Sequence, residues 1–446
     1  METDPQAWSN RSPGDLSREL PEVAASNVFA GVNRSAVAFA DWKTTKLDER
    51  KTLLSQAHDR LREKQEDLAT LIALEVGKPL REARLEMGAV VAKFDLAFAD
   101  ADRFWAEEAV TDGPHPAMVR RLPRGPAAVI APFNFPIHLG HGAALGYLLA
   151  GNTVLFKPSP LAANVGEAYA AVMQEVLPEG VFELVQGWGS VGRALCLHDK
   201  VRAVCFTGSV PVGRGLARDL GADYSKSLAL ELGGKNSLIV CADADLDLAA
   251  EAAADGICLT TGQRCNSTSR ILVDRKVGQV FADKLDASLE RYQPGDPLDE
   301  KTMLGPLISE KAVERYRHLT GQGAVKGYFV KPVIQRIEEG AYQIEEEAFC
   351  PVATLETFAG PDAVVARHDS SAWGLTASLF TKSEQTFRML GDQLSVGNLY
   401  HNLPTTFSPS ALPFGGVRAS GNGKPGARGF IRFAADEQAV QWRAQG

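Results

Sequence analysis

The spacing of apolar residues indicates a helical first part of the chain, over residues 33–104. Apolar residues recur there at three- and four-residue steps with charged residues between them, as at Leu54, Ala57 and Leu61. This period is typical of amphipathic helices. The segment Gly77–Pro79 interrupts the pattern, because glycine and proline end helices. The pattern therefore predicts two successive helices.

Short segments with strand patterns follow from residue 117 onward: residues 117–122 alternate, and later apolar runs such as 127–131 predict buried strands. A first series lies at residues 117–122, 127–131, 152–156, 181–185, 201–206 and 228–230. A second series lies at residues 236–240, 270–273, 352–358, 376–381 and 396–400. Helical patterns separate many of these runs, and they include residues 164–177, 246–259 and 277–292. Strands that alternate with helices build parallel sheets covered on both faces. The fold class is therefore α/β, with two sheets and a boundary near residues 232–235.

Composition and charge limit the partners that remain. The 446 residues are 45% hydrophobic and 23% charged, with a net charge of −8, which is typical of a globular protein. An acidic chain lacks the broad basic surface that nucleic acids and anionic membranes attract. The longest apolar-rich stretch, residues 142–156, is too short and too polar to span a bilayer. We therefore expect no nucleic-acid partner and no membrane partner.

The N-terminal residues and the cysteine content indicate the compartment. Residues 1–26 are polar and contain three prolines, so they predict a loose or extended arm. Their start lacks the basic and apolar regions of a secretory signal. The six cysteines form no Cys-x-x-Cys pair, so we expect no metal site, and they are too sparse for a disulfide scaffold. These features predict a cytoplasmic protein with reduced cysteines.

One cysteine has different sequence neighbours from the rest. Apolar residues on predicted strands or helices surround four of the others, namely Cys196, Cys205, Cys241 and Cys258. Cys265 instead ends a polar loop, residues 260–265, in which Gly262 permits close backbone approach. Arg264 and the start of a helix after the cysteine would lower the pKa of its thiol. Cys265 is therefore the candidate nucleophile, with a buried inert thiol as the alternative.

Two glycine-rich segments are candidates for phosphate binding. Residues 187–192, from Gly187, match the Gly-x-Gly-x-x-Gly pattern after a predicted strand. The acid usual about 20 residues later is missing, so a plain strand-to-helix turn explains the segment equally well. Residues 206–213 also follow a strand and lead into a helix, where backbone N–H groups can hold a pyrophosphate. Ser209 would be an added donor there.

Two further segments follow predicted strands, where ligands bind in parallel sheets. Glu231 precedes two glycines, which suits contact with a ligand, although a surface acid is the simpler interpretation of this segment alone. Asn134 lies between two prolines in residues 132–136, and its amide could donate to an oxyanion. A rigid turn is the alternative. Residues 347–349 and 413–416 are compatible with ordinary loops.

The order of these segments carries more information than any one of them. The sequences PFNFP, KPS, FTGS, ELGGK, GQRC, EEAFCPV and PFGGVRASG occur in this order between residues 132 and 421. The chain resembles the aldehyde dehydrogenase superfamily in these motifs, over roughly residues 30–440. The resemblance implies two parallel-sheet α/β domains, a Rossmann-like NAD(P)-binding domain and a catalytic domain, plus a small β-flap for oligomerisation. The implied divisions are 1–114, 126–232 and 417–432 for the NAD(P)-binding domain, 233–416 for the catalytic domain, and 115–125 and 433–446 for the flap.

The resemblance assigns roles to the catalytic candidates. Cys265 would attack an aldehyde, and the oxyanion would be held by the Asn134 amide and the Cys265 backbone N–H. Hydride would pass to NAD or NADP, and Glu231 would activate water to release the acid. A homodimer or homotetramer is implied, and we expect residues 117–122 and 438–443 to pair across subunits.

The resemblance also places a set of residues around the cofactor. Lys157 resembles the contact to the adenosine ribose, and Ser209 resembles the contact to the pyrophosphate. Glu347 and Phe349 resemble the pair that positions the nicotinamide ribose and ring. The remaining implied cofactor contacts are Phe133, Gly187, Gly208 and Gly213.

The sequence departs from the family pattern at three places. Pro160 replaces the acid that usually hydrogen-bonds the ribose 2′-hydroxyl, so the preference between NAD and NADP is open. Cys350 replaces a glycine, and its larger side chain is expected to crowd the nicotinamide loop. Residues 318–331 are short for the family, so an edge strand of the catalytic sheet is expected to be trimmed or absent.

Residues 75–84, 134–139 and 419–425 resemble the succinylglutamic semialdehyde dehydrogenase branch, which oxidises an aldehyde bearing carboxylates. The branch suggests His138, Arg264 and Ser410 as contacts for an anionic tail. Asn266 and Ser267 depart from it, so the substrate stays open. The alternatives are a coenzyme A-acylating variant, which retention of Glu231 disfavours, and a non-catalytic nucleotide-binding relative, which the intact motifs disfavour.

Overall fold

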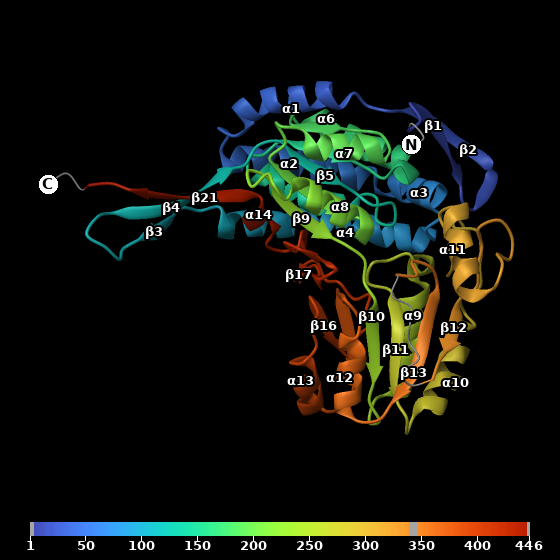
Figure 1. The fold of residues 1–446 in the computed structure, drawn as a ribbon. Helices are drawn as coiled ribbons and strands as arrows, with labels where there is room; N and C mark the ends of the chain where they lie inside the picture. The colour runs from blue at the N-terminus through green and yellow to red at the C-terminus, as the bar shows by residue number, and fades with distance from the viewer. Residues whose placement is uncertain (1–3, 339–346, 444–446) are drawn as a thin grey trace.

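The computed structural model describes residues 4–338 and 347–443. Figure 1 shows two lobes joined side by side and a thin β-arm that projects from one of them. Each lobe is built around a six-stranded sheet, ordered β19-β9-β8-β5-β6-β7 in the first lobe and β12-β13-β11-β10-β15-β16 in the second. The α/β class predicted from the sequence is confirmed.

The N-terminal residues form an antiparallel hairpin of β1 (Ala7–Ser12) and β2 (Asp15–Ala24). The predicted arm is therefore extended but not loose. The indole N–H of Trp8 and the amide of Asn10 both donate to the Pro160 carbonyl oxygen, at 3.1 and 2.9 Å. These bonds attach the hairpin to the first lobe.

The helical region contains four helices rather than the two predicted. They are α1 (Val28–Trp42), α2 (Leu47–Glu63), α3 (Gln65–Val76) and α4 (Leu80–Phe104). The expected break is present, because Gly77 takes a left-handed conformation with φ +76° at the end of α3. The end of α1 escaped prediction because Thr44 and Thr45 hydroxyls donate to carbonyls three residues earlier, a local competition with helix continuation.

The first sheet has five parallel strands and one short antiparallel strand. The parallel strands are β5 (Ala127–Ile130), β6 (Val154–Lys157), β7 (Phe182–Leu184), β8 (Ala203–Thr207) and β9 (Ser227–Glu231). Strand β19 (Gly421–Asn422) pairs antiparallel with β9. The associated helices are α5 (His138–Leu149), η1 (Pro160–Ala162), α6 (Ala163–Val176), α7 (Gly189–Leu197), α8 (Val210–Leu220) and α14 (Phe430–Phe433).

The second sheet is parallel throughout. Its strands are β10 (Asn236–Val240), β11 (Thr268–Asp274), β12 (Val333–Arg336), β13 (Val352–Phe358), β15 (Thr376–Phe380) and β16 (Asn398–His401). The helices are α9 (Leu246–Cys258), η2 (Leu259–Gly262), α10 (Gly278–Leu289), α11 (Glu310–Thr320), α12 (Pro361–Asp369) and α13 (Glu384–Gly391). An edge strand is present despite the short segment before it, because β12 pairs in parallel with β13 from Val333 opposite Val352.

The β-arm contains β3 (Glu108–Val110), β4 (Ala117–Pro123) and β21 (Ala435–Gln441). Strand β4 lies between the other two, and Ala117 is opposite Gln441 of the same chain. The two segments therefore pair with each other within one chain rather than across subunits, and β21 keeps one unpaired edge among the described residues. Pairing of that edge with a second subunit stays a prediction. The arm stands clear of both lobes (Figure 1).

Two small pairings connect the C-terminal segments, β14 (Trp373–Gly374) with β18 (Val417–Arg418) and β17 (Pro413–Phe414) with β20 (Gly426–Ala427). Among the described residues, no helix is both long and apolar enough to cross a bilayer.

Candidate active site

The register of the first sheet brings distant residues to one edge. Ile130 of β5 lies opposite Lys157 of β6 and Phe206 of β8, and Thr207 lies opposite Glu231 of β9. The carboxyl ends of these strands therefore meet, which is where open parallel sheets bind ligands. The chain leaves this edge at Glu231 and enters the second sheet at Asn236. Asn236 is opposite Thr268, the first residue of β11, so Cys265 lies near the same junction.

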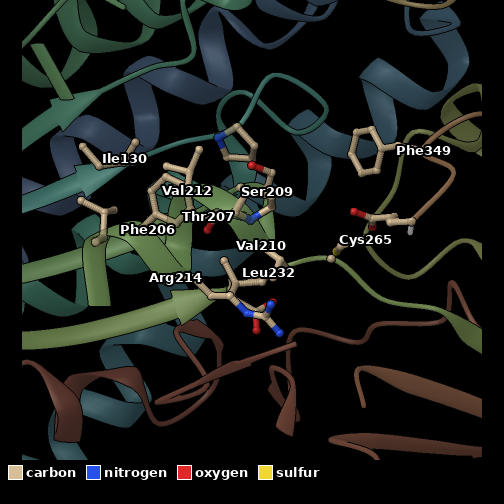
Figure 2. Close-up of a pocket in the computed structure, with 18 of the residues that line it drawn as sticks. Ile130, Phe206, Thr207, Ser209, Val210, Val212, Arg214, Leu232, Cys265 and Phe349 are labelled. Carbon is tan, nitrogen blue, oxygen red and sulfur yellow. The ribbon is translucent and has the colours of Figure 1, made fainter. Parts of the chain in front are cut away.

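A cavity of about 1640 Å³ occupies this junction. Nine of the predicted site residues line it: Phe133, Asn134, Lys157, Gly208, Ser209, Glu231, Cys265, Glu347 and Phe349. Figure 2 shows Cys265 and Phe349 at one end and Ile130 and Phe206 toward the other. Gly213 and Gly187 are packing positions beside the cavity, since a Cβ would lie within 2.6 Å of Leu232 at the first and of Val191 at the second.

The loop before Cys265 has an unfavourable backbone that tertiary contacts hold in place. Thr260 and Thr261 have φ of +52° and +55°, a region that β-branched residues rarely adopt. One carboxylate oxygen of Glu82, on α4, accepts from the Thr260 N–H at 2.9 Å and from its hydroxyl at 3.0 Å. Gly262 has φ +69°, and a Cβ there would lie 2.4 Å from the Cys350 carbonyl carbon. The loop is therefore specified by its neighbours.

The thiol of Cys265 does not have the lowered pKa that the sequence predicted. Burial raises its pKa, the Glu231 and Glu347 carboxylates raise it further, and the opposing effect of Arg264 is smaller. The chain continues from Cys265 through a turn into β11, so the helix N-terminus expected to stabilise a thiolate is replaced by a strand. The prediction of a lowered pKa is wrong because it left out burial and the two distant carboxylates, Glu231 and Glu347.

Arg264 contacts the loop rather than the cavity. Its guanidinium donates to Glu82 at 2.7 Å and to the Thr260 hydroxyl at 2.9 Å. The ring of Phe135 lies 5.0 Å from the guanidinium carbon. Through these contacts Arg264 stabilises the loop at residues 260–265. The position of Arg264 therefore does not support its suggested role as a substrate contact.

Asn134 is hydrogen-bonded to the loop at residues 260–265. Its buried side-chain amide donates to the Gln263 carbonyl oxygen at 2.7 Å. An amide nitrogen carries two hydrogens, so one N–H remains for a ligand. The Cys265 carbonyl accepts from Asn236 at 2.9 Å, which fixes the peptide plane that follows the cysteine.

Glu231 ends β9 as a buried carboxyl group. One of its oxygens accepts from the Gly416 N–H at 3.1 Å, so the loop at residues 413–416 contributes to the site. Burial raises the pKa of Glu231 to about 8, and the Gly416 N–H and Lys424 only partly oppose this. A carboxyl group with this pKa is well matched to proton transfer near neutral pH.

Glu347 and Phe349 close the same end of the cavity. The Gly234 N–H donates to Glu347 at 3.2 Å, and burial raises the pKa of this carboxyl group to about 8. A Cβ at Gly233 would lie 2.1 Å from the Glu347 carboxylate, so a side chain there would displace it. The Phe349 ring packs edge-on against Phe133, with centroids 5.8 Å apart.

Cys350 does not crowd the cavity as expected. Its side chain is buried in a core cluster with Leu307 and Tyr316, and burial raises the pKa of its thiol to about 12. All six cysteines, each within the described part of the chain, are free.

The far end of the cavity has the groups that a dinucleotide requires. Lys157 is buried, its ammonium donates to the Pro158 carbonyl at 3.2 Å, and burial lowers its pKa to about 8. Ser209 is the N-cap of α8, yet its side chain makes no capping bond, so the hydroxyl is available to a ligand. Helix N-termini attract phosphate groups, and Ser209 and Val210 line the cavity. Pro160 lies at the same end. These residues fit NAD or NADP.

Two other suggested substrate contacts lie elsewhere. His138 is at the start of α5, with its pKa far below the ordinary value because of burial and the nearby Lys93. Ser410 lines a second, small cavity together with Lys93. The residues that sequence reasoning missed are Glu82, Glu86 and Lys93 on the buried face of α4. The sequence could have indicated them, because they are charged residues at positions where the helical pattern of α4 places apolar ones.

Comparisons with known proteins identify the family of the chain. The aldehyde dehydrogenase family model matches residues 3–440. N-succinylglutamate 5-semialdehyde dehydrogenase from Burkholderia thailandensis is 34% identical, with 96% of this chain and 91% of that protein covered. A Caulobacter vibrioides protein with the same activity name is 32% identical, with coverages of 96% and 93%.

Solved structures show the same fold. An NAD-dependent aldehyde dehydrogenase from Sinorhizobium meliloti has a TM-score of 0.93 at 28% identity, covering 98% of this chain and 91% of that one. Glyceraldehyde-3-phosphate dehydrogenase from Methanocaldococcus jannaschii, complexed with NADP, has a TM-score of 0.93 at 26% identity and covers 100% of both chains. The chain therefore belongs to the aldehyde dehydrogenase family and is an NAD(P)-dependent oxidoreductase that acts on aldehydes.

Proposed function

We propose that the chain oxidises an aldehyde that carries a carboxylate, such as succinylglutamic semialdehyde, to the carboxylic acid through a covalent intermediate on Cys265. The observation that supports this most strongly is the meeting of Cys265, Asn134 and Glu231 at one cavity. These three residues come from segments far apart in the sequence, and together they would supply a nucleophile, an oxyanion donor and a base. The named activity of the relatives supports the substrate class.

In the first step the Cys265 sulfur bonds to the aldehyde carbon, and the thiol proton passes to solvent water. The carbonyl oxygen becomes an oxyanion in the thiohemiacetal. The second N–H of Asn134 and the Cys265 backbone N–H are the donors for this oxygen. Because Asn134 is already bonded to Gln263, its amide is oriented before substrate arrives.

The cofactor supplies the oxidant. NAD or NADP, when bound there, would supply the chemistry of hydride acceptance from the former aldehyde carbon, and a thioester on Cys265 would remain. The residues that would hold the dinucleotide are Lys157 for the adenosine ribose, Ser209 and the α8 N-terminus for the pyrophosphate, and Glu347 and Phe349 for the nicotinamide. Replacement of the usual acid by Pro160 removes the group that excludes a 2′-phosphate, so we propose that both NAD and NADP are used.

In the last step Glu231 removes a proton from water, which attacks the thioester carbon. The C–S bond breaks, the acid leaves and the thiol is restored. The Gly416 N–H holds one Glu231 oxygen, so the other is free to meet the water. A pKa of about 8 makes Glu231 a stronger base than an exposed glutamate.

We also propose a division of the chain and an assembly. The NAD(P)-binding domain comprises residues 1–114, 126–232 and 417–432, the catalytic domain comprises 233–416, and the flap comprises 115–125 and 433–446. The outer strands of the β-arm, β3 and β21, each pair on one side only within the described chain. Open edges of this kind invite pairing with another chain, which favours a homodimer or homotetramer. Six free thiols favour a reducing compartment such as the cytoplasm.

The test is a kinetic panel of semialdehydes and simple aldehydes with NAD and with NADP, followed by absorbance of the reduced nicotinamide. We expect turnover to the free acid without coenzyme A, and a loss of about 10³-fold or more in Cys265→Ala. Cys350→Ala is the matched control, because that thiol lies in the core. Wild-type rates in Cys265→Ala, or turnover only when coenzyme A is present, would overturn the proposed function.

A further inference from the structure

A second cavity lies between α4 and α5, separate from the cavity that contains Cys265. Its walls are one face of α4, from Lys93 through Ala97 to Asp100, and Gly142 and Gly146 of α5. These positions are one helical turn apart on each helix. Ser410 and Arg428 contribute polar groups to the lining, and Leu96, Phe430 and Ile431 contribute apolar ones. The cavity volume is about 20 Å³, enough for a water molecule or a small polar group.

Lys93 stands out in this cavity because it has no counter-ion. Its side chain is 5% exposed, and it makes no hydrogen bond or ion pair with any residue that the structure describes. Burial without a compensating anion lowers its pKa to about 8. An isolated buried ammonium group is costly, so this position calls for an anionic partner from outside the chain.

The acids around Lys93 are already neutralised. Asp100 pairs with Arg428 at 3.2 Å and also accepts from the Gly429 N–H. Glu86 pairs with Lys78, and Glu82 pairs with Arg264. Each of these carboxylates has its own cation, so Lys93 adds a net positive charge.

Helix α5 runs from the loop that contains Asn134, the proposed oxyanion donor, to the cavity that Lys93 lines. Asn134 lies in the loop that leads into α5, and His138 lies in the first turn of that helix. The Lys93 ammonium is among the groups that depress the His138 pKa, so the two are close. Gly142 follows one turn later, about 6 Å along the helix. A Cβ at Gly142 would lie 3.0 Å from the Lys93 nitrogen, so glycine leaves room beside the ammonium.

We propose that Lys93 binds the carboxylate at the far end of the aldehyde substrate, in the cavity between α4 and α5, with Ser410 as a second donor. The ligand class is an ω-oxo carboxylic acid whose aldehyde reaches Cys265 while its carboxylate meets the ammonium. This inference rests on the proposed function. An ammonium–carboxylate contact in a buried site is short and strong, and it would supply the anion that Lys93 lacks.

The experiment compares ω-oxo carboxylic acids of increasing length with n-alkanals of the same carbon number, for the wild type and Lys93→Met. We expect kcat/KM for the preferred ω-oxo acid to fall by about 10- to 100-fold, mostly through KM. The rate with the matched alkanal should change by less than about twofold, since an alkanal has no carboxylate. Lys93→Arg keeps the charge and should retain part of the preference. Lys64→Met, at an exposed lysine, is the matched control.

A second variant tests the same site without removing the lysine. Gly142→Ala adds a methyl group against the ammonium and should also lower the preference for the ω-oxo acid. Equal losses on both substrate types in Lys93→Met would overturn the inference while leaving the proposed function intact. A wild type without preference for the ω-oxo acid would overturn the inference together with the carboxylate-bearing substrate class of the proposed function. A wild type that oxidises no aldehyde would overturn the proposed function itself, and this inference with it.

Discussion

Two buried acids of α4 near the loop at residues 260–265, Glu82 and Glu86, differ in their partners from two buried charges that line the cavities. These two are Glu231 and Lys93. On α4, Glu82 is bonded to Arg264 and Thr260, and Glu86 is bonded to Lys78. Glu231 in the main cavity accepts one backbone N–H and has no ion pair among the described residues, and Lys93 in the second cavity has no partner there either. Burial consequently shifts the pKa of Glu231 and of Lys93 to about 8.

This difference distinguishes charges that stabilise the structure from charges that can bind a proton or a ligand. A paired buried charge holds its neighbours in place, and removing one partner leaves the other uncompensated. An incompletely paired charge keeps capacity for a proton or a ligand, at a cost in stability. The Glu82–Arg264 pair therefore holds Thr260 in its left-handed conformation. We expect Glu231 and Lys93 to be available to water and substrate.

The largest effect is expected at Glu231. Glu231→Gln keeps the Gly416 contact but removes the base, so steady-state turnover should fall by about 10²- to 10⁴-fold. One equivalent of reduced nicotinamide per active site should still form rapidly, because the thioester forms before the base acts. Rapid-mixing absorbance measures the burst. Absence of the burst together with lost turnover would place Glu231 in the first step and break the proposed sequence.

A smaller effect is expected when the loop support is removed. Glu82→Ala leaves Arg264 and the Thr260 N–H without their acceptor, and a small misplacement of a nucleophile can lower kcat by about 10²-fold. The free energy of unfolding should also fall by about 3–5 kcal/mol, since one partner of a buried pair is lost. Urea denaturation and kcat measure the two effects. Unchanged stability and kcat would contradict the supporting role of the α4 carboxylates.

The pH dependence follows from the raised pKa of Glu231. Its carboxyl group is mostly protonated below pH 8 and ionised above it, and only the ionised form accepts a proton. Where deacylation limits turnover, kcat should therefore rise with pH by about tenfold between pH 7 and pH 9. The profile of kcat against pH for the wild type measures this. A kcat that falls over the same interval would contradict Glu231 as the base.

The smallest effect is expected at an exposed pair. Arg388 and Glu384 lie one turn apart on α13, and both side chains are exposed. Arg388→Ala should leave the melting temperature and kcat at their wild-type values, because solvent screens such pairs. Calorimetry of Arg388→Ala and Glu82→Ala under the same conditions compares the two melting temperatures directly. A loss as large as that of Glu82→Ala would mean that burial is not what distinguishes the two kinds of pair.

Much of the site could be predicted because its residues follow local patterns. The ends of apolar strands located Glu231, Asn134 and the segment that contains Ser209, and parallel sheets collect such ends at one edge. Lys157 came from the family resemblance. The order of the motifs then carried the family resemblance. Predictions that depended on burial or on distant partners failed. Arg264 was expected to lower the Cys265 pKa, yet its charge is directed to Glu82, 182 residues earlier in the sequence.

By itself, the amino-acid sequence determined the alternation of strands and helices, the break at Gly77, the polar loop that ends in Cys265 and the acidic overall charge. These depend on side-chain periodicity and residue type, which are local properties. Only the tertiary structure decided which charges are paired, which pKa values shift, that β4 pairs with β21 in the same chain, and that Lys93 borders a cavity. These depend on desolvation and on contacts between residues far apart in the chain, and no local pattern encodes either.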